Sequence, residues 1–289
     1  MKEAMHYERL ESSAVRCGLC PHECRIEAGS RGLCGVRENR GGTLYALNYG
    51  MTAASAIDPI EKKPLHAFLP GTWSYSYAAV GCNMRCGWCQ NYALSQSPKQ
   101  NRRIKGRFLE PETHVELARR YGCESLAATY SEPTIYFEYA LSIMRLAHEA
   151  GLKNIWVSNG FINPAPLEDI LPYLDAANID YKGPSDEMYR RHCGARAAPV
   201  METMRRLQQA GKHLEVTTLI IPGINDSEDS LEAIAAALSS NLKADTPWHL
   251  SRFFPAWKST RPPTPLPTLK RARRIGRKHG MRNIRLGNV

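Results

Sequence analysis

The chain has 289 residues, of which 43% are hydrophobic, so it can bury a full core in one large domain, alone or with a small additional module. It carries no apolar run of transmembrane length and no N-terminal signal peptide, which argues against a membrane protein and favours a cytoplasmic location. The net charge is +10, densest over residues 270–285, but no aromatic residues interleave there as single-strand nucleic-acid binders require. We therefore expect no nucleic-acid partner, and in that stretch the solvated face of a last helix with Ile275 inward.

The first 70 residues are predicted to form a cysteine-rich module, and residues 71–289 the main domain. Cys17, Cys20, Cys24 and Cys34 place four thiols within eighteen positions. Four soft ligands at this spacing suit a closed tetrahedral zinc site or a second iron–sulfur cluster, and we favour zinc. His22 could replace one ligand, although its position between two of the cysteines makes joint ligation awkward.

The remaining cysteines fit a reducing compartment, in which thiols serve as metal ligands or stay free rather than forming disulfides. Cys123 and Cys193 stand apart from the other cysteines in the sequence. We expect both to be buried and to act as small hydrophobic residues.

The main domain alternates short strand-like runs with helical stretches, which predicts parallel βα units. The expected strands cover residues 74–82, 125–131, 154–160, 177–183, 213–222 and 249–254, with a short last strand over 283–289; expected helices include 111–121, 134–150 and 166–174. Right-handed crossovers would curl such units into a barrel or part of one, with ligands at the carboxyl ends of the strands. The strand count alone also allows an open doubly wound sheet.

The first of these strands ends in the motif Gly81-Cys-Asn-Met-Arg-Cys-Gly-Trp-Cys-Gln-Asn91. Iron–sulfur clusters normally take a cysteine thiolate at every iron, so the C-x3-C-x2-C spacing of Cys82, Cys86 and Cys89 leaves one corner of a [4Fe-4S] cube open. The alternatives are a zinc knuckle that lacks a ligand and thiols that lie close together by accident. Structural zinc requires four ligands, and the next twenty residues contain neither Cys nor His, which argues against the knuckle.

This motif closely resembles that of the radical S-adenosylmethionine (SAM) enzymes. The resemblance implies that the amino and carboxylate groups of SAM occupy the open iron, and that an electron from the cluster cleaves SAM to methionine and a 5'-deoxyadenosyl radical. Trp88, directly before the third cysteine, matches the family and is expected to pack near the adenine. The family also implies a partial (β/α)6 TIM-like barrel.

Two further strand ends carry polar segments that the resemblance makes informative. Ser131 and Glu132 stand where related enzymes have a Gly-Gly-Glu-Pro segment that pairs with the SAM amino group. Ser158, Asn159 and Gly160 resemble the Thr-Asn-Gly that contacts SAM in activase-like enzymes. Taken alone, the first segment reads as a loop before a helix and the second as a turn.

The later strand ends add a charged pair and a turn. Asp180 and Lys182 share one face of their strand, where opposite charges must pair or meet a ligand; relatives use such residues near the SAM carboxylate and the reacting centre, and a simple salt bridge is the alternative. Pro222 and Gly223 match a turn that lies by the adenine in activase-like relatives. His249 is either a substrate contact or a structural histidine.

The segment Ile57-Asp-Pro-Ile-Glu-Lys-Lys-Pro-Leu-His66, read together with the two cysteine motifs, is similar to the activase-like radical SAM proteins of the AmmeMemoRadiSam system across the whole chain. Lys62, Lys63 and His66 either line the site or form a basic surface loop. Glycyl-radical activases usually have Gly-x-Gly-x-Arg before the first strand, which is absent here, and often an Asp where this chain has Val157. A cation site there is therefore not expected.

The sequence thus predicts an enzyme that cleaves SAM reductively and uses the radical on an unidentified small molecule or protein. The resemblance implies an electron donor of the flavodoxin or ferredoxin type. The alternatives are a glycyl-radical-enzyme activase, against which the missing Gly-x-Gly-x-Arg argues, and a non-catalytic iron–sulfur scaffold.

Overall fold

A nine-stranded sheet forms the centre of the protein, whose computed structural model describes residues 1–289. Seven neighbouring strands are parallel and follow one another in chain order. They are β8 (Trp73–Ala79), β10 (Ser125–Ala128), β11 (Lys153–Ser158), β12 (Ala176–Asp180), β13 (His213–Ile220), β14 (Trp248–Arg252) and β15 (Ile284–Gly287). Because the order of the strands never reverses, the sheet is a partial barrel and not a doubly wound sheet.

Each of the six main predicted strands exists but ends two or three residues earlier than predicted. Left-handed backbone follows several of the strands, with φ of +114° at Gly81, +62° at Tyr130 and +70° at Gly160. Such a conformation breaks the extended ladder. The polar motifs therefore begin at the last residue of a strand, as at Ser158 and Asp180, or lie in the loop that follows it.

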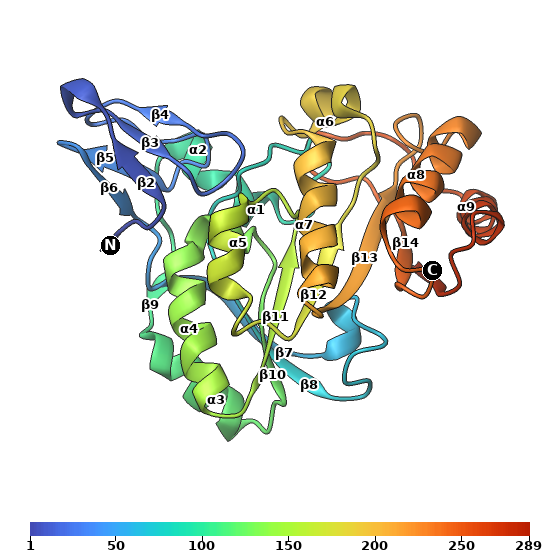
Figure 1. Ribbon diagram of the computed structural model, residues 1–289, viewed down its shortest axis with the longest axis horizontal. Helices are drawn as coiled ribbons and strands as arrows, with labels where there is room; N and C mark the ends of the chain where they lie inside the picture. The colour runs from blue at the N-terminus through green and yellow to red at the C-terminus, as the bar shows by residue number, and fades with distance from the viewer.

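The helices of the main domain connect these strands, and Figure 1 shows α4, α5, α7 and α8 together on one side of the sheet. Serine caps start two of the helices, since Ser185 and Ser227 accept hydrogen bonds from the amides of Met188 and Ser230. The helices are α1 (Tyr92–Ser95), α2 (Ser97–Asn101), α3 (Pro111–Arg120), α4 (Phe137–Glu149), α5 (Pro164–Ile170), α6 (Asp186–His192), α7 (Ala197–Gln209), α8 (Glu228–Asn241) and α9 (Leu266–Lys278), with the 3-10 helices η1 (Glu11–Ser13), η2 (Ile60–Lys62) and η3 (Pro133–Tyr136). In α9, Ile275 is buried as expected. No helix is both long and apolar enough to cross a membrane.

The N-terminal part forms two small antiparallel sheets at one end of the molecule (Figure 1). One contains β1 (Lys2–Glu3), β6 (Thr43–Ala46) and β5 (Arg37–Arg40), and the other β2 (Tyr7–Arg9), β3 (Val15–Cys17) and β4 (Arg25–Ile26). A buried ion pair joins them to the main domain, because Arg37 Nη2 donates to both carboxylate oxygens of Glu138 on α4 at 2.7 and 2.8 Å. Removing one partner would leave the other charge buried and unpaired.

One strand from the first 70 residues belongs to the main sheet. β7 (Met51–Pro59) pairs antiparallel with β8, and β9 (Arg107–Phe108) pairs antiparallel with β7. A boundary between a cysteine-rich module and the main domain at residue 70 thus stays a proposal. The strand β7 precedes that boundary but forms part of the edge of the barrel.

The segment that follows β7, residues 60–69, fills the barrel below the strand ends; we call it the floor segment. Its Leu65 is fully buried and packs with Ala127, Ile155 and Ala176 of β10, β11 and β12. The buried carboxylate of Glu215 on β13 accepts hydrogen bonds from the next two backbone amides, those of residues 66 and 67, at 2.8–3.1 Å. Apolar packing and a charged acceptor together hold this segment inside the barrel.

Candidate functional site

A cavity of about 410 Å³ opens at the carboxyl ends of the parallel strands. Ten of the residues predicted from the sequence line it, which places side chains from the ends of four separate strands in one space. They are Cys82, Cys86, Trp88, Cys89, Ser131, Glu132, Ser158, Asn159, Asp180 and Lys182. Loops from neighbouring parallel strands meet at this edge, which is where α/β barrels bind their ligands.

The loop that carries the three cavity cysteines is held close to the N-terminal part. A side chain at Gly81 would place its Cβ 2.8 Å from Val36 and 2.9 Å from Ile135, so only glycine fits at its positive φ. Cys82 Sγ receives the Met84 amide at 3.3 Å and Asn159 Nδ2 at 3.7 Å, and Cys89 Sγ lies 3.2 Å from Ser95 Oγ. Donors around sulfur favour the thiolate, the form that binds iron.

Burial acts in the opposite direction and raises the pKa of the Cys82 and Cys89 thiols. No three His, Cys, Asp or Glu side chains of the protein converge on one point as a single metal ion would require. A cluster that takes one thiolate at each of three irons makes no such demand, because its irons are separate corners of a cube. The donor set at this loop therefore fits the cluster that the motif implies.

Cys193 lies beside this loop, contrary to the expectation that it is isolated, although it is fully buried as predicted. A hydrogen bond between the Cys86 and Cys193 thiols raises the pKa of Cys86 and lowers that of Cys193. The backbone also joins the two segments, since the Arg85 amide donates to the Cys193 carbonyl at 2.8 Å. No spacing in the sequence connects positions that lie more than one hundred residues apart.

Asp180 and Lys182 form the predicted pair at the end of β12. Lys182 Nζ lies 3.2 Å from Asp180 Oδ2, and the Lys182 side chain is 11% exposed while that of Asp180 is 49% exposed. Burial alone would lower the pKa of Lys182, but Asp180 and the nearby thiols outweigh it and raise that pKa well above its usual value. The cavity thus contains the charged ammonium group of Lys182, paired with the carboxylate of Asp180.

Glu132 joins the ends of β10 and β11. Its carboxylate accepts hydrogen bonds from Ser158 Oγ at 2.7 Å, the Asn159 amide at 2.8 Å and the Thr134 amide at 3.0 Å, and the residue is only 2% exposed. Burial raises the pKa of Glu132, and these donors offset the increase only in part. Asn159 in turn donates to Asn83 Oδ1 at 2.9 Å, so Glu132 helps to position the cysteine loop.

The other predicted site residues lie in different surroundings. Trp88 is 5% exposed and packs 5.8 Å from the ring of His192. Gly160 is buried against Ile179 and does not line the cavity. Pro222 and Gly223 also lie outside it: Arg261 Nη1 donates to the Pro222 carbonyl at 2.8 Å, and the Gly223 amide donates to Asp226 at 2.7 Å.

A histidine cluster around Glu215 lies below the cavity and was not predicted. Glu215 Oε2 lies 2.6 Å from His249 Nε2, and Oε1 lies 3.0 Å from His213 Nε2. His249 is 3% exposed and does not line the cavity, so it is a structural histidine and not a substrate contact. The rings of His66 and His249 are 5.2 Å apart, so His66 belongs to the same cluster. A single Glu within a strand of apolar and Thr residues was the available signal.

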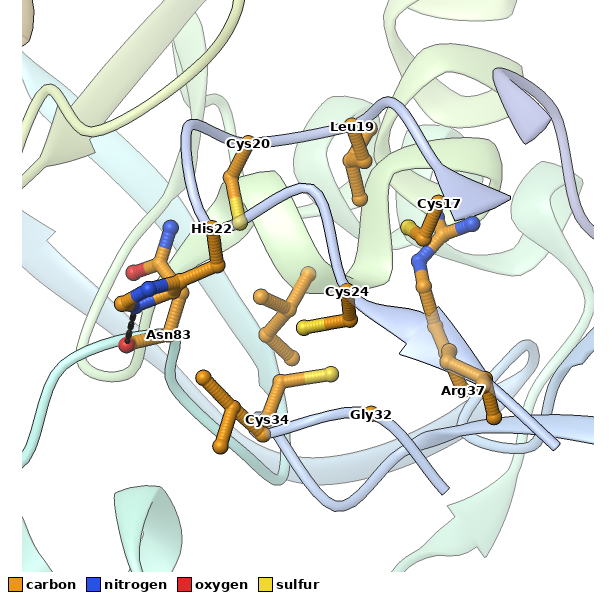
Figure 2. A pocket seen from close by; sticks show the side chains of 12 residues that line it. Cys17, Leu19, Cys20, His22, Cys24, Gly32, Cys34, Arg37 and Asn83 are labelled. Atoms are coloured by element: carbon orange, nitrogen blue, oxygen red, sulfur yellow. Dashed lines mark hydrogen bonds between the residues drawn. The ribbon is translucent and has the colours of Figure 1, made fainter. Parts of the chain in front are cut away.

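Figure 2 shows the four N-terminal cysteines around one small pocket, with their sulfur atoms turned toward it. Burial raises the pKa of the Cys17 thiol to about 11 and also raises that of Cys20 and Cys24. The His22 ring is turned away from the thiols, and its Nε2 lies 2.8 Å from the Asn83 carbonyl of the cysteine loop. Three of the four thiols are buried, and because no three of them converge on one point here, a metal that bound them as thiolates would have to draw them closer together.

Comparison with protein families gives one match, to the family described as the radical SAM superfamily, over residues 77–236. An uncharacterized protein of Methanocaldococcus jannaschii is 45% identical over 290 aligned residues, which cover 100% of this chain and 86% of that protein. The isethionate sulfite-lyase activating enzyme of Oleidesulfovibrio alaskensis is 28% identical over 41% of this chain and 40% of its own length.

Solved structures share the fold at low sequence identity. A radical SAM methyltransferase from Sphaerobacter thermophilus gives a TM-score of 0.60 at 16% identity and covers 77% of this chain and 68% of its own. A domain of a pyruvate-formate lyase-activating enzyme from Bacteroides vulgatus gives a TM-score of 0.51 at 14% identity, over 57% of this chain and 99% of its own. These likenesses bear on the fold alone.

Proposed function

This chain belongs to the radical SAM superfamily, with relatives among activating enzymes, and on that premise we propose that it binds a [4Fe-4S] cluster through Cys82, Cys86 and Cys89 and cleaves SAM reductively. The observation that carries the proposal is the single cavity in which these thiols meet the polar ends of β10, β11 and β12. When bound, the cluster supplies the electron that breaks the sulfonium carbon–sulfur bond of SAM. The resulting 5'-deoxyadenosyl radical would take a hydrogen atom from a substrate.

The residues around the thiols are proposed to bind and orient SAM. Lys182 supplies a fixed positive charge and Asp180 a carboxylate at the same edge, which suits the carboxylate and ammonium of an amino acid. Asn159, Ser158 and Ser131 offer polar groups from neighbouring loops. Trp88 supplies an apolar wall that excludes water from that side. Glu132 is already engaged with three donors, so we assign it to positioning Asn159 rather than to direct binding.

Gly160, Pro222 and Gly223 are proposed to support the site indirectly. Gly160 follows Asn159 directly and permits the left-handed turn that aims it at the cysteine loop. Pro222 and Gly223 form the turn after β13, which a hydrogen bond to Arg261 fixes from the far side. Contact of this turn with the adenine would require the loop to move toward the cavity.

We propose a second metal centre at Cys17, Cys20, Cys24 and Cys34, filled by zinc or by a second iron–sulfur cluster. Its support is a pocket between four thiols, three of them at least nine-tenths buried. The two small sheets that carry these thiols are too short to form a core of their own. The metal would therefore stabilise the segment from which His22 reaches the cysteine loop.

A small electron-transfer protein of the flavodoxin or ferredoxin type is the proposed reductant. Arg85 within the cysteine loop, Arg190 and Arg196 line a surface hollow of about 320 Å³, together with Gly194 beside Cys193. All three arginines are exposed. An acidic partner that docked there would come close to the cysteine loop from outside the cavity. All nine cysteines are free thiols, which suits a reducing, cytoplasmic setting for this reaction.

The similarity to isethionate sulfite-lyase activating enzymes supports a second candidate, an activase that acts on a protein partner. The chain has no Gly-x-Gly-x-Arg segment before β8. We therefore keep the broader proposal, in which the substrate is a small molecule or a protein, ahead of this one.

The proposal is tested on anaerobically reconstituted protein with SAM and dithionite. Wild type should be brown, show a reduced-cluster EPR signal and form 5'-deoxyadenosine, measured by chromatography. Cys86→Ala should form no 5'-deoxyadenosine and should lose the colour and EPR signal of the cavity cluster, whereas Cys123→Ala, a buried cysteine away from the cavity, should keep all three. The assignment fails if a four-iron cluster survives in a variant that lacks Cys20 as well as the three cavity thiols, since loss of Cys20 removes any cluster at the N-terminal cysteines; a loaded wild type that forms no 5'-deoxyadenosine would favour the scaffold.

A further inference from the structure

The cavity lining has a second group of residues, apart from the thiols and the residues proposed to bind SAM, and we call it the second side of the cavity. Lys62 and Pro64 of the floor segment line it with Tyr130 after β10. Thr217, Ser251 and Asn288 add uncharged polar groups from β13, β14 and the C-terminal end. This side offers hydrogen-bond donors and one ammonium group, but no aromatic platform other than Tyr130.

A buried charge cluster supports this side from below. Asp58 Oδ2 accepts hydrogen bonds from Lys63 Nζ at 2.5 Å and Tyr130 OH at 2.6 Å, with Ser76 Oγ at 3.4 Å. Lys62 Nζ reaches the other oxygen, Oδ1, at 3.3 Å. Burial alone would raise the pKa of Asp58, but Lys63, Tyr130 and Lys62 lower it to about 2, so the carboxylate is charged at neutral pH.

The charges of this cluster do not cancel. One carboxylate, Asp58, faces two ammonium groups, and its closer partner is Lys63, whose side chain is 2% exposed. The Lys62 side chain, which lines the cavity, is 68% exposed and makes the longer contact with Asp58, at 3.3 Å. The other cavity lysine, Lys182, has Asp180 as its own partner. The ammonium of Lys62 is therefore the cation of the cavity whose charge is least neutralised.

The backbone of Tyr130 shows that this arrangement is built at a cost. Tyr130 adopts φ of +62°, a left-handed conformation that bulky residues rarely take because it is strained. Its hydroxyl bond to Asp58 and the Lys63 ammonium 4.8 Å from its ring hold it there. Such strain persists where surrounding contacts determine the position of a functional group.

We propose that Lys62 recognises a carboxylate or phosphate of a small acidic substrate, with Asp58, Lys63 and Tyr130 as positioning residues. The inference rests on the proposed function, because the hydrogen abstracted must belong to a molecule in this cavity. A volume of about 410 Å³ lies near the lower end of the range for one drug-sized ligand, yet it must admit SAM and the substrate together. A small molecule with one anionic group meets both the size and the charge.

The experiment uses cluster-loaded enzyme and a cell extract divided by ultrafiltration into small molecules and proteins. The small-molecule part is divided again on an anion exchanger at pH 8. Each fraction is tested for two effects: 5'-deoxyadenosine formed above the rate without substrate, and compounds that co-elute with the enzyme, identified by mass spectrometry. Lys62→Met removes the charge, Lys62→Arg keeps it, and Lys270→Met removes an exposed lysine of α9 as the matched control.

Wild type should be stimulated by the anion-exchanger-bound fraction and should retain an acidic compound from it. Lys62→Met should need roughly ten to a hundred times more of that fraction for the same stimulation, because hydrogen bonds to charged groups contribute on this scale. Lys62→Arg and Lys270→Met should behave much like wild type. The proposal would be overturned if only the fraction that does not bind the anion exchanger, only the protein fraction or no fraction stimulated the enzyme. It would also be overturned if Lys62→Met responded as strongly as wild type.

The two proposals fail in different ways. If wild type cleaves no SAM under dithionite, the proposed function is wrong, whatever compounds the enzyme retains. If wild type cleaves SAM but Lys62 does not affect retention or stimulation, only the substrate inference is wrong. Tyr130→Phe adds a check on positioning. Loss of its hydrogen bond to Asp58 should raise the amount of the fraction needed for half-maximal stimulation while leaving the cluster spectrum unchanged.

Discussion

Replacing Glu132 tests whether the loops at the strand ends must be held in place for SAM to be cleaved. Glu132→Ala removes the acceptor of three buried donors, those of Ser158, Asn159 and Thr134. A buried donor without an acceptor costs about 1–3 kcal/mol, and relief from burying the Glu132 carboxylate offsets part of that. We expect a net loss of about 2–4 kcal/mol in the free energy of unfolding.

The larger effect should be on the reaction. Without Glu132, the Asn159 backbone is free to shift, and its side chain, which donates to Cys82 Sγ and Asn83 Oδ1, shifts with it. A displacement of about 1 Å costs roughly a hundredfold in rate. Glu132→Gln keeps one acceptor oxygen but turns an NH2 group toward a donor, so we expect an intermediate loss of about tenfold.

The assay is 5'-deoxyadenosine formation by reconstituted protein under dithionite, with the cluster content of each variant fixed by its iron content and visible spectrum. Glu124→Ala is the matched control. Glu124 directly precedes the first residue of β10, at the end of the strand away from Glu132, and its carboxylate also accepts a backbone hydrogen bond, from the Trp73 amide at 3.1 Å. It should cleave SAM at the wild-type rate. If Glu132→Ala does so too with a normal cluster, Glu132 does not position the site and the reasoning is refuted.

Three further outcomes are expected. A variant without the three cavity cysteines should still contain a metal by elemental analysis, and Cys20→Ser should lose it; no metal in the first variant would contradict a second centre. Glu215→Gln should lower the free energy of unfolding by about 2–4 kcal/mol at pH 7. Hydrogen bonds from His213, His249 and the amides of the floor segment hold the pKa of Glu215 below 4.5. The difference in stability from wild type, followed by urea unfolding, should therefore be present above pH 4.5 and shrink as the pH falls below it. A difference that stays constant with pH would argue against this role of Glu215. Arg85→Glu should slow SAM cleavage driven by reduced ferredoxin but not cleavage driven by dithionite, and Arg274→Glu on α9 should slow neither. If Arg85→Glu and wild type cleave SAM equally fast with reduced ferredoxin, the hollow is not the docking site.

The sequence was most informative where function depends on neighbours along the chain. The spacing of Cys82, Cys86 and Cys89 is local, and each strand is followed within a few residues by its polar loop. The parallel order of the strands then places these loops side by side, so a prediction of element order was also a prediction of which residues meet. The ends of the strands were predicted two or three residues too late, because left-handed residues such as Gly81 were not recognised as strand breaks.

The contacts that the sequence did not reveal join distant segments. Glu215 holds amides about 149 residues earlier, Tyr130 bonds to Asp58 across 72 residues, and Cys86 meets Cys193. Neither a period of 2 nor one of 3.6 residues carries such information. The turn at Pro222 resembles that of activase-like relatives in its residue types, but hydrogen bonds to Arg261 and Asp226 hold it outside the cavity, so its contact with the adenine stays a prediction.

The two sides of the cavity therefore depend on different parts of the chain. The thiol side is built by loops that directly follow their own strands, and Glu132 connects two of them. The second side combines the floor segment, which the Glu215 carboxylate and the burial of Leu65 hold inside the barrel, with Tyr130 after β10 and residues of β13 and β14. Tyr130 lies two residues before Glu132 in the same loop and donates to Asp58, so it connects the two sides. The exposed Lys62 ammonium makes only a 3.3 Å contact with this network, so we expect its replacement to alter substrate choice more than SAM cleavage.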